Sequence, residues 1–208
     1  MKVVTLLEND FEQECKRLAD LVSSNYTPDL VVGILTGGGY VGKRIFNVLK
    51  AKSNVKYIEI RIERGGTEIK RKYNLKHILH SFPDFILNFL RIVEVHILEV
   101  LSKIRVPKRH SNISISEDIR TYLEEGQRRI LIVDDCIDTG ASLKCVLDYF
   151  KSEFRIKHDL KIAVITKAHR KPLVEVDYLL YKRVLIRFPW SFDTKDKKDL
   201  GKHSDKNN

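Results

Sequence analysis

The sequence predicts an α/β protein in which a mainly parallel central sheet is flanked by helices. Two continuous apolar runs, residues 29–35 and 129–133, are typical of strands that are buried on both faces of a parallel sheet. Each run leads through a glycine-containing turn into apolar residues at helical spacing. Alternating strands and helices form an α/β sheet, whose functional side chains gather at the carboxyl ends of the strands.

The length and composition fit one globular domain. The chain has 208 residues, of which 43% are hydrophobic and 32% charged, so a disordered or collagen-like protein is excluded. We expect a single domain over residues 1–190, with a helical insertion at about 73–106 and a disordered polar tail at 191–208. The net charge of +10 favours a phosphate-bearing partner, either a nucleic acid or a small polyphosphate.

Cysteine usage and hydropathy predict a cytoplasmic protein. Cys15, Cys136 and Cys145 form no CxxC pair and are odd in number, which indicates neither a disulfide framework nor a zinc site. The start of the chain lacks the apolar run of a signal peptide. The most apolar stretch, residues 82–101, contains too many polar side chains to span a bilayer, so we expect no membrane partner.

The elements of the amino-terminal part follow from their apolar spacing. A helix comes first, because apolar residues recur at helical spacing from Phe11 to Val22, and Asn9 with Glu12 resembles a capping box. The elements that follow it are a strand at residues 29–35, a helix at 41–50 and a strand at 55–62. Together these three form a βαβ unit.

The later elements are separated from this unit by a segment of different character. A basic loop at residues 61–72 leads into a helical stretch at about 75–104, which looks inserted. The elements after it are a strand at residues 129–133, a helix at 142–150, a strand at 161–166 and a hairpin-like apolar run that ends at Trp190.

The turn after the strand at residues 129–133 carries the groups expected of a phosphosugar site. The carboxylates of Asp134 and Asp135 can accept hydrogen bonds from ribose hydroxyls or hold Mg²⁺. Gly140 permits torsions that other residues disfavour, and the N–H groups that follow it lie at a helix N-terminus, where a phosphate is stabilised. The alternative is that Asp138 and Ser142 are only helix caps, which would be the better explanation for an isolated acidic pair.

The whole run of residues 130–143 resembles the signature of type I phosphoribosyltransferases that binds phosphoribosyl pyrophosphate (PRPP). The resemblance implies that Asp134 and Asp135 bind the ribose hydroxyls of PRPP and hold Mg²⁺ directly or through water. It also implies that Asp138 is the catalytic general base near the nucleobase. The residues that it assigns to the 5′-phosphate are Thr139, Gly140, Ala141 and Ser142.

Residues 29–38 are similar to the first strand and the pyrophosphate loop of the same family. The loop would consist of Thr36, Gly37 and Gly38, whose backbone N–H groups would approach the leaving group. Members of the family often have Arg or Lys at the position of Thr36. Lys43 or the basic loop would then supply the missing cation.

Residues 162–190 resemble the bacterial xanthine-guanine phosphoribosyltransferases, with a small C-terminal hood over the base. The resemblance implies that Lys167 donates a hydrogen bond to the 6-oxo group of a purine. Leu185 stands where the family has an aromatic residue that stacks on the base, and Ser191 stands where it has a carboxylate. Trp190 is as well explained by packing as by ligand binding.

The family resemblance implies an enzyme that transfers the phosphoribosyl group of PRPP to a nucleobase, with Mg²⁺. The basic loop that includes Arg61 and Arg64 could close over the pyrophosphate, or it could be a solvated basic face. We expect a homo-oligomer, for which the apolar helix at residues 85–104 offers a contact surface.

Two other functions are compatible with parts of the sequence. Residues 37–43 match the GxxxxGK pattern of a P-loop NTPase, but Arg44 stands where Mg²⁺ coordination requires Ser or Thr. A catalytically weak regulator that binds nucleic acid would suit the net charge of +10. The intact acidic pair and Asp138 favour catalysis over nucleic-acid binding.

Overall fold

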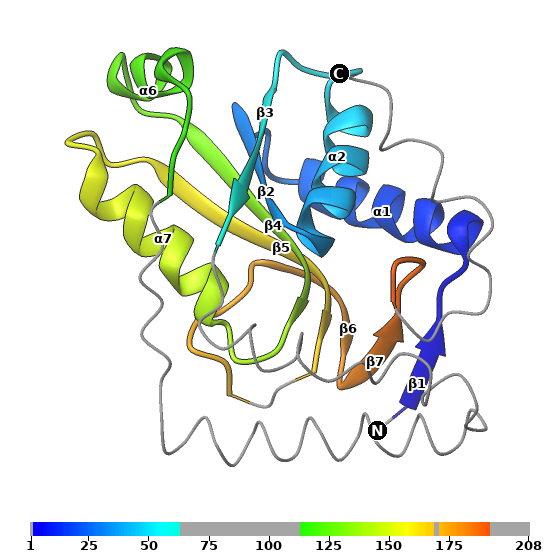
Figure 1. The fold of residues 1–208 in the computed structure, drawn as a ribbon. Coiled ribbons are helices and arrows are strands. Elements are labelled where there is room, and N and C mark those ends of the chain that lie inside the picture. Colours follow the sequence, from blue (N-terminus) through cyan, green and yellow to red (C-terminus); the bar gives the residue numbers. More distant parts are fainter. Residues whose placement is uncertain (1, 63–112, 169–170, 192–208) are drawn as a thin grey trace, which may run out of the picture.

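A computed structural model describes residues 2–62, 113–168 and 171–191 of the chain (Figure 1). Its strands are β1 (Lys2–Thr5), β2 (Leu30–Leu35), β3 (Lys56–Arg61), β4 (Arg129–Ile137), β5 (Asp159–Lys167), β6 (Tyr178–Lys182) and β7 (Val184–Arg187). Its helices are α1 (Glu8–Ser23), α2 (Gly37–Leu49), α6 (Glu117–Glu124) and α7 (Ala141–Glu153). Most of the basic loop, the predicted insertion at 73–106 and residues 192–208 of the polar tail lie outside the described residues. The single-domain assignment of residues 1–190 stays a prediction.

Five strands form a parallel sheet in the order β3-β2-β4-β5-β6. This confirms the predicted α/β class and the predicted βαβ unit. All five strands run in one direction, so their carboxyl ends meet at one edge of the sheet.

In the part of the chain that the structure describes, no helix has the length and apolarity that crossing a membrane requires.

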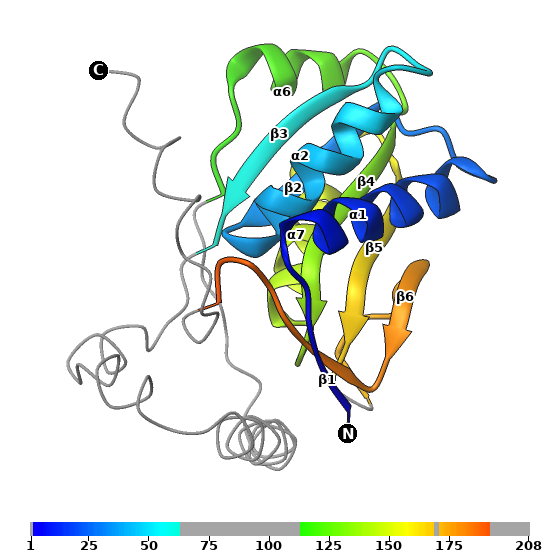
Figure 2. The same ribbon diagram turned by 90° about the vertical axis from the view of Figure 1, so that its right-hand side faces the viewer.

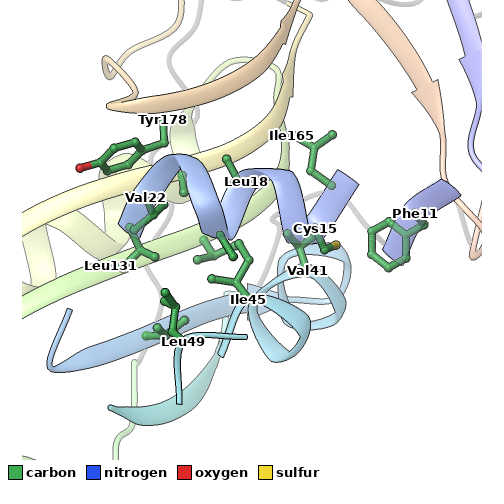
Figure 3. Packing of buried hydrophobic residues seen from close by; sticks show 14 of the residues in the cluster. Phe11, Cys15, Leu18, Val22, Val41, Ile45, Leu49, Leu131, Ile165 and Tyr178 are labelled. Carbon is green, nitrogen blue, oxygen red and sulfur yellow. The ribbon is translucent and has the colours of Figure 1, made fainter. Parts of the chain in front are cut away.

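Apolar residues alternate between the two faces of the sheet, and helices cover both faces (Figure 2). Val31 and Leu131 face α1 and α2, whereas Val32 and Ile132 face α6 and α7. Figure 3 shows the apolar core on the first of these faces, in which α1 and α2 pack on β4 and β5. Because both faces are buried, each central strand reads as a continuous apolar run rather than an alternating one.

The predicted boundaries of three elements are wrong. Helix α1 begins at Glu8, and its N-cap residue Leu7 has no side-chain cap, so the predicted capping box does not form. Helix α2 begins at Gly37 rather than at residue 41. Strand β4 continues to Ile137, so the acidic pair belongs to the strand rather than to the turn after it. Pairing with the long strand β5 extends β4 beyond its apolar part.

The C-terminal run is not a hairpin. Strand β6 pairs in parallel with β5, and β7 pairs in parallel with β1 in a separate two-stranded sheet. A hairpin would have required antiparallel pairing between β6 and β7. The sequence patterns predict neither β1 nor α6, which are short. We call the β1–β7 sheet together with residues 188–191 the hood, and its predicted place over a base stays a prediction.

Candidate active site

The ends of β2 and β4 bring the two predicted donor-side segments into contact. The strands pair in parallel as far as Gly33 and Val133, so the residues that follow lie side by side. A Cβ atom on Gly38 would lie 2.6 Å from the carbonyl oxygen of Val133 and 2.9 Å from Oδ1 of Asp134. A Cβ atom on Gly37 would overlap the carboxylate of Asp135. The glycine pair and the acidic pair can therefore be this close only because neither glycine has a side chain.

The acidic pair is held by the backbone of its own strand. Oδ1 of Asp134 accepts a hydrogen bond from the N–H of Asp135 at 3.0 Å, and Oδ1 of Asp135 accepts one from the N–H of Cys136 at 2.9 Å. Asp134 is buried, and both carboxylates face the first turn of α2. The positive end of the α2 dipole stabilises the negative charge there.

The predicted general base follows the acidic pair at the end of β4. Asp138 is exposed, and its Oδ1 accepts a hydrogen bond from the thiol of Cys136 at 3.5 Å. Burial, and then the negative charges of Asp138, Asp135 and Asp134, raise the pKa of Cys136 well above its usual value. Cys136 therefore stays a thiol and acts as a weak donor rather than a nucleophile.

The predicted phosphate-binding residues surround the N-terminus of α7. Gly140 is the N-cap and has a φ of 77°, in the left-handed region that favours glycine. The carbonyl oxygen of Thr139 accepts a hydrogen bond from the N–H of Leu173 at 2.9 Å, which ties the turn to a later loop. Ala141 and Ser142 form the first turn of the helix, so their N–H groups point out of its N-terminus.

The two predicted base-binding residues lie at the same edge of the sheet as Asp138. Lys167 ends β5, in register with Ile137 of β4 and Lys182 of β6. Leu185 on β7 is buried and packs against Cys136 and other small apolar side chains. The structure thus gathers both residues near the end of β4, which Asp138 follows, although their roles toward a base stay predictions.

The hood is held by aromatic packing. Trp190 stacks on Phe188 with ring centroids 4.8 Å apart, and it contacts Phe11 edge-on at 5.0 Å and Tyr40 at 4.8 Å. The Ser191 hydroxyl accepts a hydrogen bond from the N–H of Phe188 at 3.0 Å. These contacts account for Trp190 as a packing residue.

The P-loop interpretation is wrong. In a P-loop, the glycine-rich segment is a loop that wraps the phosphates, but here α2 begins at Gly37 and the segment is helical. Lys43 lies two turns inside the helix, with its Nζ 5.5 Å from the centre of the Tyr57 ring. Arg44 forms ion pairs with Glu8 and Glu12 of α1, so it holds the two helices together instead of binding a metal.

Thr166 is a residue of the site region that the sequence patterns do not single out. Its hydroxyl donates a hydrogen bond to the carbonyl oxygen of Val184 at 2.6 Å. Threonine is common in strands, and the partner is a backbone atom of a different strand, so no sequence signal could have found the pair.

Within the described ranges, no group of three or more His, Cys, Asp and Glu side chains could hold a metal ion.

Comparisons with known proteins identify the family to which the chain belongs. The family model described as "Phosphoribosyl transferase domain" matches residues 4–197. The hypoxanthine-guanine phosphoribosyltransferase of Streptococcus mutans is 24% identical over 147 residues, which cover 65% of this chain and 79% of that protein. The enzyme of the same name from Streptococcus pyogenes is 28% identical over 127 residues, which cover 56% of this chain and 68% of that protein.

Solved structures have the same fold. The purine phosphoribosyltransferase of Pyrococcus horikoshii has a TM-score of 0.58 at 20% identity, covering 92% of this chain and 95% of that chain. The xanthine-guanine-hypoxanthine phosphoribosyltransferase of Helicobacter pylori has a TM-score of 0.54 at 15% identity, with the same coverage of 92% and 95%. At these identities the structures show the fold alone, whereas the family model spans most of the sequence. The chain therefore belongs to the phosphoribosyl transferase family and is a type I phosphoribosyltransferase related to the bacterial purine phosphoribosyltransferases.

Proposed function

We propose that the protein transfers the 5-phosphoribosyl group of PRPP to a ring nitrogen of a 6-oxopurine and releases pyrophosphate. The observation that carries this proposal is the contact of Gly37 and Gly38 with the acidic pair, beside the N-terminus of α7. Sites for a pyrophosphate, a ribose and a 5′-phosphate are then adjacent, in the order in which PRPP carries these groups.

The donor half of the reaction would use backbone and carboxylate groups. The N–H groups of residues 139–142 would bind the 5′-phosphate, because the N–H groups of a helix N-terminus and the positive end of the helix dipole favour an anion. Asp134 and Asp135 would accept hydrogen bonds from the ribose hydroxyls. Thr36, Gly37 and Gly38 would present the backbone N–H groups at the start of α2 to the pyrophosphate.

The acceptor half would use residues at the ends of β4 and β5 and on β7. Lys167 would donate a hydrogen bond to the 6-oxo oxygen, and Leu185 would contact the base. The bond between C1 of the ribose and the pyrophosphate oxygen breaks, and a bond between C1 and the ring nitrogen forms. The proton on that nitrogen would pass to Asp138, whose exposed carboxylate is free of any structural ion pair among the described residues. The hypoxanthine-guanine enzymes among the relatives support a 6-oxopurine as the base.

The carboxylates of Asp134 and Asp135 suit Mg²⁺. This ion prefers oxygen ligands and usually keeps several waters, binding through one or two carboxylates together with substrate phosphates. When bound, the ion would neutralise charge on the departing pyrophosphate.

A cytoplasmic location and a homo-oligomeric state belong to the same proposal. The three free cysteines support a reducing compartment. The surface expected to join subunits, residues 85–104, lies outside the described residues. The alternative of a nucleic-acid-binding regulator rests on the net charge of +10.

The decisive experiment is to incubate the protein with PRPP, Mg²⁺ and a panel of bases, and to measure pyrophosphate release. We expect turnover with hypoxanthine, guanine or xanthine and a much lower kcat/KM with adenine. Asp138→Asn should lower kcat by about 10²–10⁴-fold, the usual contribution of a general base, while PRPP still binds. Asp148→Asn, on the exposed face of α7 and paired with Lys144, is the matched control and should not change kcat.

Two results would contradict the proposed function. One is the absence of pyrophosphate release with every base although PRPP binds. The other is full PRPP binding by the Asp134→Asn, Asp135→Asn double variant, because the ribose hydroxyls would then have lost their proposed acceptors without effect.

A further inference from the structure

The hydroxyl of Thr166 joins the two sheets of the protein. Thr166 is the second-last residue of β5 and is only 1% exposed. Its Oγ1 donates to the carbonyl oxygen of Val184 at 2.6 Å and lies 3.4 Å from that of Tyr181. Val184 begins β7, which pairs with β1 and not with the five-stranded sheet. This hydrogen bond therefore links the end of a central strand to the hood.

A second link lies one residue later in β5 and one residue before Val184. The N–H of Arg183 donates to the carbonyl oxygen of Lys167 at 2.8 Å, and its Nη1 donates to that of Ala168 at 3.5 Å. Arg183 has a φ of 61°, which residues other than glycine seldom adopt. This conformation connects β6 to β7 while the Arg183 N–H bonds to the end of β5.

These links are next to both predicted base-binding residues. Lys167 directly follows Thr166, and Leu185 directly follows Val184. The two residues come from different sheets, and no strand pairing between β5 and β7 fixes their spacing. The hydrogen bond from Thr166 to Val184, at 2.6 Å, joins these two strands directly.

Packing alone does not require the hydroxyl. Valine has nearly the same shape as threonine, and the neighbouring buried positions of β5 are filled by apolar residues such as Val164 and Ile165. A valine at residue 166 would fill the space but would leave the carbonyl oxygen of Val184 without this donor. The hydrogen bond to Val184 therefore explains why a hydroxyl group is present at this apolar position.

We propose that Thr166 is a positioning residue that sets the spacing between Lys167 and Leu185, and thereby the selectivity for 6-oxopurines. This inference rests on the proposed function, in which those two residues contact the base. Because Thr166 is only 1% exposed, we expect it to touch neither the base nor PRPP. Its effect should therefore appear in base binding and not in PRPP binding.

The test compares three single variants of the full chain by steady-state kinetics. Thr166→Val removes the hydroxyl at nearly constant volume, and Thr166→Ser keeps it. Tyr26→Phe is the matched control, because Tyr26 also donates a side-chain hydrogen bond to a backbone oxygen of β5, that of Asp159 at 2.9 Å, but at the opposite end of the strand. Circular dichroism and thermal unfolding establish that each variant is folded.

We expect Thr166→Val to raise the KM for the 6-oxopurine about five- to tenfold, a change as large as the loss of the hydrogen bond from Lys167 to the base would cause, and to leave the KM for PRPP unchanged. The ratio of kcat/KM for the 6-oxopurine to that for adenine should fall. Thr166→Ser should retain the wild-type ratio, and Tyr26→Phe should change neither KM. If Thr166→Val behaves like Tyr26→Phe, or if both KM values rise together, Thr166 has only a structural role and the inference is wrong.

The outcomes separate this inference from the function on which it rests. The wild-type protein is assayed first with the panel of bases. A wild-type protein that turns over no base contradicts the proposed function, and the positioning role falls with it. An active wild-type protein with an unchanged Thr166→Val variant contradicts the positioning role alone.

Discussion

Gly38 and Gly140 are needed at the candidate site for different physical reasons. Gly140 has a φ of 77°, so a side chain there would strain the backbone. Gly38 has no positive φ, but a Cβ atom would lie 2.6 Å from the carbonyl oxygen of Val133 and 2.8 Å from the Cα of Asp134. Gly140 is required by its backbone torsion, and Gly38 is required because β4 and α2 leave no space for a side chain.

We predict that Gly38→Ala destabilises the fold by about 1–3 kcal/mol, because helix α2 must move away from β4. The same movement should weaken PRPP binding, because it separates the glycine pair from the acidic pair. Urea unfolding and PRPP titration measure the two effects. Gly126→Ala is the control, since nothing lies within 4 Å of its added Cβ atom. Equal stability of Gly38→Ala and the wild-type protein would show that the contact with β4 is looser than the structure indicates.

Interactions between elements hold the helices on the sheet. Arg44 of α2 pairs with Glu8 and Glu12 of α1, and its guanidinium lies 4.6 Å from the centre of the Phe11 ring. On the other face, α7 ends in an aromatic group in which Phe150 stacks on Phe154. This group continues into the loop before β5 through the edge-on contact of Phe154 with His158, at 5.5 Å between ring centroids.

His158, in the loop before β5, predicts a pH dependence of stability. His158 accepts a hydrogen bond at Nδ1 from the N–H of Arg128, and burial, followed by the charge of Arg128, lowers the pKa of His158 below 6.5. The folded state therefore binds a proton less readily than the unfolded state does. The free energy of unfolding should decrease as pH falls through 6.5 and below, and be unaffected by this group above it.

Urea unfolding at pH 7.5 and at pH 5.5 measures this effect. His158→Asn is the comparison, because its amide oxygen can accept the same hydrogen bond without titrating. The decrease in unfolding free energy toward low pH should be smaller in His158→Asn than in the wild-type protein. A decrease of the same size in both proteins would assign the pH dependence to other groups. His158 is the only histidine among the described residues.

At the scale of the whole molecule, the hood and the main sheet are joined through one aromatic cluster. Trp190, the single tryptophan of the chain, contacts Phe11 of α1 and Tyr40 of α2 as well as Phe188. Phe11 is fully buried in the core between α1, α2 and the sheet. The hood is therefore packed on the same core that holds the two helices.

We predict that the hood unfolds together with the rest of the molecule. Trp190 fluorescence and far-ultraviolet circular dichroism should give coincident transitions in urea, as expected for one cooperative unit. Trp190→Phe identifies the fluorescence signal and should remove it. A fluorescence transition at a clearly lower urea concentration than the dichroism transition would mean that the hood separates before the sheet unfolds.

Much of the sheet and of the donor side could be predicted because the relevant signals are local. The apolar runs of β2 and β4 identify strands that are buried on both faces, and residues 130–143 hold strand, acids, turn and helix start in one contiguous segment. Other local signals failed. The capping box at Asn9 does not form, since α1 begins at Glu8, and the acidic pair lies within β4 because pairing with β5 extends the strand.

The sequence by itself determined the α/β class and the strand-to-helix segment that ends at Ser142, because backbone preferences and apolar spacing act between near neighbours. Only the tertiary structure decided which segments meet. It paired β7 with β1, brought Gly37 and Gly38 against the acidic pair, and joined Thr166 to Val184. The physical reason is that these contacts depend on how distant strands pair and pack, and a residue's identity does not specify a partner that far along the chain.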